Sequence, residues 1–433
     1  MNKRYVVELS LGKRYGASRL NCDESGQQKD MVINGSRFNR ISSQSKKKLV
    51  KDTFMKFLVD VYGENERIYN TRGIKKILEK RLIETQDPLF QESASEIASF
   101  VVEEVMGCKF KEDDPETTNQ ILVFTEYEVK DIIETFCSTV SAENWDVFQK
   151  ELSALAEYKA AEAKNKNKKG KKNGSKKPEK PNSDIAKTMK AKLGKMSGIR
   201  LTGIICSLFG RMSTVDVIPS VESAISVNHS FSFGRANTDA DYFIACDNYL
   251  SESENESGAQ SGAAYLDNKD FSSHVYYEYV SIDVEQFYKN LCKGLDMNEE
   301  SNQNKVRCVV EEAIKFVINA FAVSAPSGGQ HAFASTPDPV GIYVSVRESG
   351  FNRSADSACM QEMFGTDNYK KTEEDKFINA MKTFVSNDFT DSQSYLAQIY
   401  AGERADEICN DSVKHMKWNE AVNTIGDMIH ERF

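Results

Sequence analysis

The sequence has few of the features that mark secreted, membrane-bound or metal-binding proteins. Its 433 residues include nine cysteines, scattered singly without a Cys-x-x-Cys pair, and only five histidines. This pattern indicates reduced thiols in a cytoplasmic protein rather than a disulfide scaffold or a zinc site. No apolar run is long enough to cross a membrane, and the charged N-terminal segment is unlike a signal peptide. We therefore expect a cytoplasmic chain with no membrane partner, no metal and no other cofactor.

Catalytic motifs are also missing. The sequence contains no GxxxxGK[ST], no GxGxxG after a strand, no GxSxG and no HExxH. Asp23, Glu24 and Asp30 could hold Mg²⁺ near a phosphate, but acids in such a loop more often form turns or pair with Arg and Lys. His229 could act as a general base, but a lone histidine after an alternating apolar run is more often structural. The residues alone therefore give only a poor signal for catalysis.

Positive charge is concentrated in two parts of an otherwise acidic chain. The formal net charge is −9, yet residues 1–51 hold twelve Lys or Arg and only four Asp or Glu. A second basic run lies at 159–180. A polyanion could bind such a chain only along particular stripes of its surface.

The hydrophobic pattern predicts an α+β protein whose sheet is assembled from distant parts of the chain. Alternation over 5–11 predicts a half-buried strand, and residues 12–36 are expected to form a long loop. Helical periodicity covers much of 63–156 and is strongest at 303–324. Residues 157–183 have almost nothing apolar to bury and are predicted to be a disordered Lys-rich loop. Residues 200–234 are expected to return to a strand-bearing core.

The most informative segment is residues 37–52, RFNRISSQSKKKLVKD. Ser42 or Ser43 is a good N-cap, and the helix after it would place one apolar stripe toward the core: Val50, Phe54, Phe57, Leu58 and Val61. The free N–H groups and the dipole at the start of a helix favour an anion. Hydroxyl, amide, lysine and arginine side chains surround the start of this predicted helix. From the residues alone, a phosphate site and a capped helix with a solvated lysine face are equally well supported.

Several blocks in a fixed order resemble a known family, the CasC-type backbone subunit of the type I-E CRISPR surveillance complex Cascade. The blocks are SRLNCDESGQQKDMVINGSRFNRISSQSKKK, FGRMST, VESAISVNHSFSF, DADYFIACDNY, GAAYLDNKDFSSHVYYEYVSID and PSGGQHAFAST. They cover roughly residues 1–60 and 200–346. The segment 63–199 and the C-terminal tail carry no motif that adds to the resemblance.

The resemblance implies an RRM- or ferredoxin-like palm, a helical fingers insertion and a projecting, β-hairpin-like thumb. The expected palm is formed by residues 1–62, 200–234 and 273–433, the fingers by 63–199 and the thumb by 235–272. Subunits of this family stack head to tail along one guide RNA (crRNA), and each thumb displaces a base bound by its neighbour. The family is non-catalytic, so the resemblance implies that this chain is not an enzyme. The expected partners are therefore the guide, target DNA paired to the guide, copies of the chain and other Cascade subunits.

The resemblance also implies which residues bind the guide. Palm positions that hold the RNA backbone correspond to Lys29, Ser42, Gln44 and Lys47, with further donors beside them. Apolar positions that flank the displaced base correspond to Met212 and Leu266. The full set expected to bind RNA is Lys29, Arg37, Arg40, Ser42, Ser43, Gln44, Lys47, Lys48, Lys51, Arg211, Met212 and Leu266.

The chain departs from the family pattern in two loops. Cys22 follows Leu20 and Asn21 where the family usually has an arginine, which removes a phosphate contact. Gly328, Gly329, Gln330 and His331 occupy a loop that is basic in relatives.

Two other functions compete with the guide-binding backbone. One is a metal-dependent ribonuclease backbone subunit that uses Asp23 or Asp30 to cut target RNA. The other is a standalone RNA-binding protein that has no surveillance complex around it.

Overall fold

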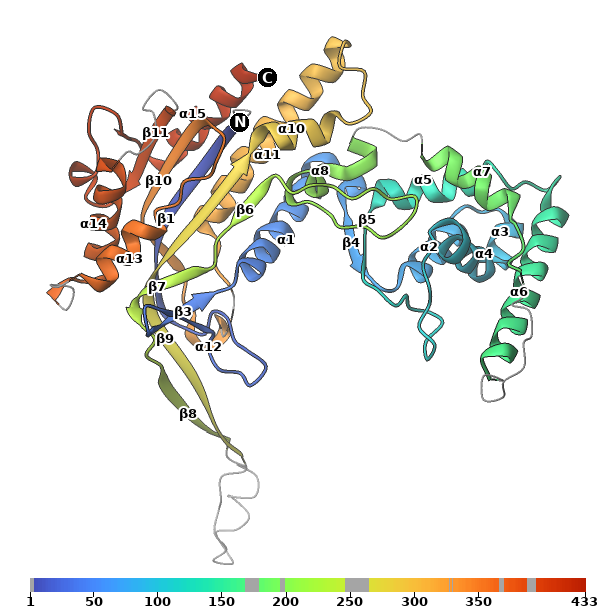
Figure 1. Cartoon of the computed structure of the whole chain (residues 1–433), viewed down its shortest axis with the longest axis horizontal. Helices are drawn as coiled ribbons and strands as arrows, with labels where there is room; N and C mark the ends of the chain where they lie inside the picture. Colours follow the sequence, from blue (N-terminus) through green and yellow to red (C-terminus); the bar gives the residue numbers. More distant parts are fainter. Residues whose placement is uncertain are drawn as a thin grey trace, which may run out of the picture. The chain divides into compact units, whose positions relative to one another are not determined.

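The computed structural model describes residues 4–167, 179–194, 199–245, 265–326, 328, 330–365, 370–387 and 395–433, and a large mixed sheet runs through it (Figure 1). The strand order is β12-β11-β10-β1-β9-β7-β3-β2, and β6 and β8 also pair with β9. The strands are β1 (Arg4–Ser18), β2 (Asp30–Ile33), β3 (Ser36–Ile41), β6 (Ile225–Val227), β7 (Ser230–Arg235), β8 (Asp239–Ala245), β9 (Tyr265–Asp283), β10 (Pro337–Ser349), β11 (Tyr395–Gly402) and β12 (Lys414–His415).

The chain divides into two units, and the predicted α+β class is confirmed. Unit 1 comprises Met1–Phe54, Ile225–Glu285 and Arg307–Phe433, and it contains the sheet. Unit 2 comprises Met55–Ala224 and Gln286–Val306. None of the helices in the described ranges is long and apolar enough to cross a membrane.

Strand β1 lies inside the sheet, between β10 and β9, and pairs antiparallel with both. The prediction of a half-buried strand is wrong, because Val6 and Val7 point to opposite faces and are both fully buried. Even Glu8 and Ser10 are buried. A strand covered on both faces must bury both sets of its side chains, so its polar residues need partners inside the protein.

Helices cover the two faces of the sheet. On one face, α13 (Asp356–Phe364) and α14 (Glu373–Ser386) bury Phe377 and Met381 against Tyr277 of β9. The other helices built largely from unit 1 residues are α1 (Ser43–Tyr62), α11 (Glu300–Val323), α12 (Gln330–Phe333) and α15 (Trp418–Arg432). Phe54 of α1 stacks on Phe316 of α11 with ring centroids 5.3 Å apart. This contact joins the helix of the basic segment to the strongest predicted helix.

The predicted stripes on these two helices are mostly confirmed. In α11, the apolar face that was predicted over 303–324 is buried: Val310, Ala313, Ile314, Val317 and Phe321. In α1, Val50, Phe54 and Leu58 are buried, but Val61 is exposed. Val61 lies in the last turn of α1, where the helix leaves the core of unit 1.

The predicted loop over 12–36 is largely wrong. Strand β1 continues to Ser18, and β2 and β3 form a hairpin, so only residues 19–29 are a loop. Asn34 and Gly35 make the turn with φ values of 46° and 77°. Positive φ at both central residues is the requirement of a tight hairpin turn, and Asn-Gly satisfies it. That dipeptide was the sequence signal for this hairpin.

The expected projecting hairpin is present in unit 1. Residues 265–271 of β9 pair with β8, and the later residues of the same strand pair with β1 (Figure 1). The hairpin is therefore a direct continuation of a strand inside the sheet. Tyr242 and Ile244 of β8 are exposed, and Ile244 is opposite Leu266 in the register.

Unit 2 is mainly helical and also contains a small sheet that the sequence did not predict. Strands β4 (Ile68–Thr71) and β5 (Leu122–Thr125) pair antiparallel. The helices are α2 (Ile74–Glu84), α3 (Pro88–Glu92), α4 (Ala94–Phe100) with a π-helical turn at Val101–Val105, α5 (Glu126–Cys137), α6 (Trp145–Asn167), α7 (Asp184–Leu193), α8 (Ile199–Phe209) and most of α10 (Val284–Cys292). Apolar side chains of α2 to α7 form one core that includes Leu78, Val102 and Phe136.

Two predictions in this part of the chain need correction. Helix α6 continues to Asn167, so the predicted loop over 157–183 begins as helix; residues 168–178 lie outside the described residues. Residues 199–209 form the kinked helix α8 instead of a strand. Gly203 has φ 63°, and a Cβ there would lie 2.8 Å from the Thr125 side chain. The kink lets the second half of α8 pack closely against β5, and Glu66 accepts a hydrogen bond from the Ile204 N–H.

Glu8 and Arg347 form an ion pair buried inside the sheet, and breaking it should destabilise the fold. The Arg347 Nε lies 2.5 Å from the Glu8 carboxylate, and both side chains are essentially inaccessible. Replacing Arg347 with Met leaves the Glu8 carboxylate buried without its counter-ion. We expect the free energy of unfolding in urea to fall by about 3–5 kcal/mol. Lys187→Met, which removes an exposed pair with Asp184, should change it little; a similarly small effect of Arg347→Met would contradict the prediction.

Candidate nucleic-acid interface

The first turn of α1 is capped by side chains from three parts of unit 1. Asn21 accepts a hydrogen bond from the Ser42 N–H at 3.0 Å, and His229 Nδ1 accepts one from the Ser43 N–H at 3.2 Å. The Ser42 hydroxyl accepts from the Ser45 N–H, so Ser42 is the N-cap. These contacts already use three donors that the sequence offered to an anion. These contacts do not use the N–H of Gln44, which lies in the same turn. Gln44 is exposed, so its N–H could bind a ligand.

His229 has a structural role at this helix start. Because Nδ1 accepts the Ser43 N–H, the neutral imidazole carries its proton on Nε2. Burial lowers the pKa of His229, and the charges of Arg40 and Lys46 lower it further. The imidazole is therefore kept neutral beside two cations.

The three consecutive lysines have three different environments. Lys46 is buried, a placement that the sequence analysis missed. Lys47 donates to the Ile225 carbonyl at 3.1 Å, and burial lowers its pKa. Lys48 is 78% exposed and pairs with Asp52 one turn later at 2.7 Å. Lys51 is partly exposed on the same helix. Successive side chains on a helix point about 100° apart, so three consecutive lysines cannot all face the solvent on one side of α1, and Lys46 faces the core.

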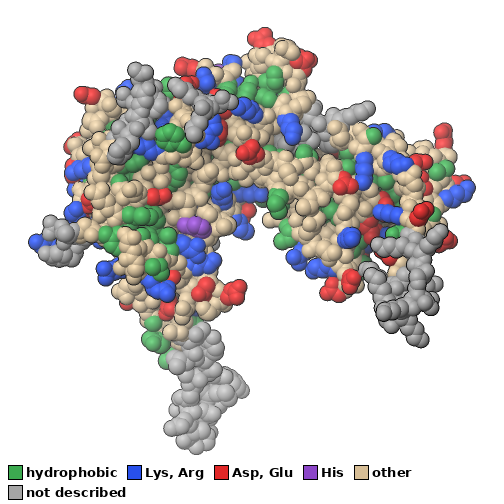
Figure 2. Space-filling model, in the orientation of Figure 1, with side chains coloured by type: hydrophobic (Ala, Val, Ile, Leu, Met, Phe, Trp, Pro, Cys, Tyr) green, Lys and Arg blue, Asp and Glu red, His purple; other side chains and the backbone are tan. Residues whose placement is uncertain are grey.

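Lys29, Arg37 and Arg40 lie beside the helix start. The Lys29 carbonyl accepts the Arg40 N–H at 2.9 Å, which joins the 19–29 loop to β3. Arg40 lies 3.5 Å from His229 Nδ1. Arg37 is 68% exposed and pairs with Asp30 at 2.6 Å. The structure therefore gathers the predicted backbone-binding side chains around one helix start, and Figure 2 shows Lys and Arg side chains clustered in this part of unit 1.

Asp23 and Asp30, two of the three acids that could hold Mg²⁺, have internal partners. One oxygen of Asp23 accepts hydrogen bonds from the Ser25 N–H, the Ser25 hydroxyl and the Gln27 N–H. The Ser25 hydroxyl contributes most to lowering the pKa of Asp23. Asp30 pairs with Arg37. Within the described ranges, no three His, Cys, Asp or Glu side chains form a group that could hold a metal ion.

Gly328 packs against the 19–29 loop, and Gly329 lies outside the described residues. A Cβ on Gly328 would lie 1.8 Å from the Arg19 carbonyl, so only glycine fits there. Arg19 in turn donates to the Gly26 carbonyl and, at 3.1 Å, to the Cys22 sulfur. Cys22 therefore lies in a turn that is held by hydrogen bonds from the Arg19 side chain. His331 lies nearby in sequence in α12 and is exposed.

Arg211 requires correction as an RNA-binding residue. Its guanidinium is buried, pairs with Glu128 at 2.7 Å and donates to the Pro219 carbonyl. The side chain holds a loop of unit 2 together and is not presented at the surface. The next residue, Met212, is 89% exposed. Leu266 belongs to β9, but its side chain lies outside the described residues.

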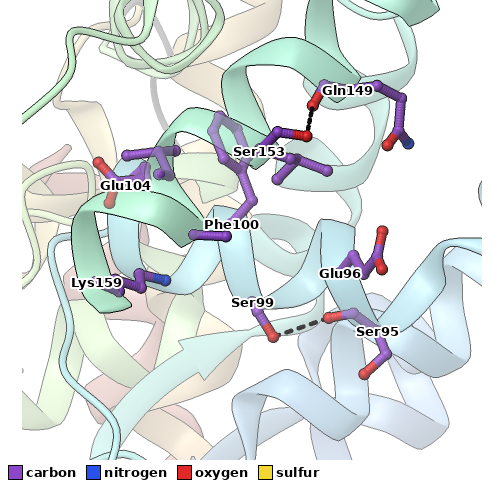
Figure 3. A pocket seen from close by; sticks show the side chains of 11 residues that line it. Ser95, Glu96, Ser99, Phe100, Glu104, Gln149, Ser153 and Lys159 are labelled. Atoms are coloured by element: carbon purple, nitrogen blue, oxygen red, sulfur yellow. Dashed lines mark hydrogen bonds between the residues drawn. The ribbon is translucent and has the colours of Figure 1, made fainter. Parts of the chain in front are cut away.

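A hollow in unit 2 has a different character. It lies between α4 and α6 and is lined by Ser95, Ser99, Phe100, Gln149 and Ser153, among others (Figure 3). Its serines donate to backbone carbonyls one turn earlier in their own helices. Lys159, the cation at its edge, pairs with Glu103. Nothing in this lining resembles the cluster of donors at the start of α1.

The fold and the site define an α+β protein with a cluster of basic and neutral donors at a helix start beside a large sheet. The model of the family described as CT1975-like protein, Cas_CT1975, matches residues 7–393. The chain therefore belongs to this family. No curated protein sequence matches.

Solved structures share this fold over nearly the whole chain. A chain of a "CRISPR RNA-guided surveillance complex, pre-nicking" has a TM-score of 0.66 and 19% identity, covering 98% of this chain and 100% of that one. A chain of a "CRISPR RNA-guided surveillance complex" has a TM-score of 0.61 and 17% identity, covering 98% and 99%. The similarity therefore extends over both units.

The cap made by His229 predicts a loss of stability in mild acid. The folded state lowers the pKa of His229, so protonation favours the unfolded chain. The stabilisation is present above the unfolded value of about 6.5 and is lost as pH falls through the lower folded value. His229→Asn keeps an acceptor that does not titrate. Thermal unfolding of the variant should depend less on pH below about 6.5 than that of the wild type; an unchanged dependence would contradict the assignment.

Proposed function

We propose that this chain is a guide-RNA-binding backbone subunit of a type I-E CRISPR surveillance complex. The observation that carries the proposal is the cluster of phosphate-type donors at the start of α1. Membership of the Cas_CT1975 family and a fold shared over nearly the full length with chains of RNA-guided surveillance complexes support it.

The proposed binding mode grips the RNA backbone without reading its sequence. A subunit that must hold any guide needs donors for phosphates and riboses, and base edges must stay free for pairing. Hydroxyls, amides and cations at the helix start suit this task. Lys47 still has two ammonium protons to offer after its bond to Ile225. The proposed contacts are Lys29, Arg37, Arg40, Ser42, Ser43, Gln44, Lys47, Lys48 and Lys51.

Two apolar residues are proposed to hold the displaced base. An apolar side chain that inserts beside a base separates it from its neighbours, and Met212 is exposed enough to do so. Leu266 is the proposed second wedge, on the hairpin that projects from the sheet. Arg211 is left out of the contacting set because its guanidinium is buried.

The proposed partners are the guide RNA, target DNA paired to the guide, copies of this chain arranged head to tail, and other Cascade subunits, all in the cytoplasm. No catalytic step is assigned to this chain. The ribonuclease alternative would need Asp23 or Asp30 to bind a metal, and both carboxylates have internal partners. Strand cutting would belong to a recruited enzyme.

Reversing the exposed charge on α1 should weaken RNA binding. Lys48→Glu combined with Lys51→Glu removes two contacting cations and adds repulsion of phosphates. We expect RNA-dependent assembly to be lost while the monomer stays folded, as checked by sedimentation and circular dichroism. The matched control is Lys414→Glu with Lys417→Glu, at exposed positions at and just after β12. Equal assembly by the two double variants would argue against the phosphate contacts.

Removing the wedges should leave RNA binding intact and change the pattern of base exposure. Met212→Ala or Leu266→Ser should retain affinity, because neither residue contacts phosphate. Chemical probing of bound guide should then lose its periodic reactivity. Ile121→Ala, at another exposed apolar residue of unit 2, serves as the control and should preserve the period. A period unchanged by both wedge variants would remove the base-displacing role.

A further inference from the structure

A buried cluster of charges lies beneath the start of α1. Glu278 of β9 places one carboxylate oxygen 3.2 Å from the Lys13 ammonium and 3.1 Å from the Lys46 ammonium. The exposed fractions of these side chains are 1%, 1% and 5%. Tyr15 donates to the other oxygen of Glu278 at 3.0 Å. Two cations therefore share one buried anion, and the cluster has a net charge of +1.

Each member has further partners that fix its position. Lys13 donates to the Phe321 and Ser324 carbonyls at the end of α11. Lys46 donates to the Ser230 hydroxyl of β7 at 2.8 Å. The negative end of the α11 dipole therefore faces Lys13, while Lys46 has only a neutral hydroxyl besides Glu278. The charge least compensated within the cluster is that of Lys46.

The protonation states of Glu278, Tyr15 and Lys46 maintain the net charge of +1 on the cluster. The two lysines lower the pKa of Glu278 despite its burial, so the carboxylate stays ionised. Burial and Glu278 raise the pKa of Tyr15, so the phenol stays neutral. Burial lowers the pKa of Lys46 to about 8, with Glu278 opposing and Lys13 adding to the effect. Lys46 is therefore charged at neutral pH and loses its charge in mild base.

The charge of Lys46 acts on a titratable group at the helix start. His229, which accepts the Ser43 N–H there, has its pKa lowered by Lys46 as well as by Arg40. A charge with protein around it is screened by salt much less than one on an exposed side chain. An anion bound at the first turn of α1 would experience the same field with the opposite sign.

We infer that Lys46 strengthens the binding of an RNA phosphate at the start of α1 through its electric field, without touching the RNA. The inference rests on the proposed function. A unit charge that acts over about 10 Å at an effective dielectric constant of about 20 changes binding by roughly tenfold. Lys48 and Lys51, in contrast, are proposed to bind by direct, salt-sensitive contact.

The variant that tests this is Lys46→Met. Methionine matches the length of the lysine stem. It leaves Glu278 paired with Lys13, so the buried cluster becomes neutral and the chain should fold. We expect affinity for a synthetic single-stranded RNA to fall by roughly tenfold. The slope of log affinity against log salt should not change, because no contacting cation is lost. Lys48→Met should instead reduce the slope by about 0.7.

A charge-retaining replacement separates the field from packing. Lys46→Arg keeps a cation beside Glu278 but changes the shape of the side chain. Its affinity should stay near that of the wild type. Between about pH 7 and about pH 9, wild-type affinity should fall as Lys46 loses its proton, and Lys46→Met should lack that change.

The outcomes distinguish the inference from the proposed function. A wild-type chain that does not bind RNA contradicts the proposed function itself. If the wild type binds, full affinity of Lys46→Met overturns the inference alone. A slope reduced by Lys46→Met would indicate direct contact, and a Lys46→Arg variant as weak as Lys46→Met would indicate packing; either result also overturns it.

Discussion

The arrangement of unit 1 around its helix start depends on one buried carboxylate, Glu278. Buried cations need an anion within reach, and Glu278 is the shared partner of Lys13 on β1 and Lys46 on α1. Through Lys13 it also reaches the last carbonyls of α11. The carboxylate therefore sets how α1 and α11 lie against the sheet.

That constraint explains how a chain with a net charge of −9 gathers basic and neutral donors around one helix start. The helix is held at its buried side by Lys46, and its first N–H groups are held by Asn21, His229 and Ser42. What remains on the surface is a small set of hydroxyls, amides and cations. Such donors suit a phosphate chain and carry no information about base sequence.

Sequence patterns predicted the elements whose periodicity was long and unambiguous. The buried face of α11 and the N-cap at Ser42 are confirmed because each depends on local spacing alone. The β2–β3 hairpin was missed although Asn34-Gly35 signalled it. Helix α8 was mistaken for a strand because its continuous apolar run fits either element, and Gly203 obscured the helical period.

The sequence indicated which donors lie together, but not which of them are buried. The donors do gather at one helix start, but composition could not show which lysine of three would turn inward, since that depends on Glu278, far away in sequence. The burial of Arg211 was missed for the same reason, because its buried partner Glu128 lies in α5, far away in sequence. Charged residues are usually exposed. Only tertiary structure reveals the exceptions.

The most direct test of the account is nuclease protection of RNA that copurifies with this chain from its native host. A subunit that grips one guide at a repeating interval should protect segments of regular length, separated by single accessible positions. A ladder of that kind would support a guide held along its backbone by successive copies of the chain. Absence of RNA, or one short footprint without a period, would contradict the account.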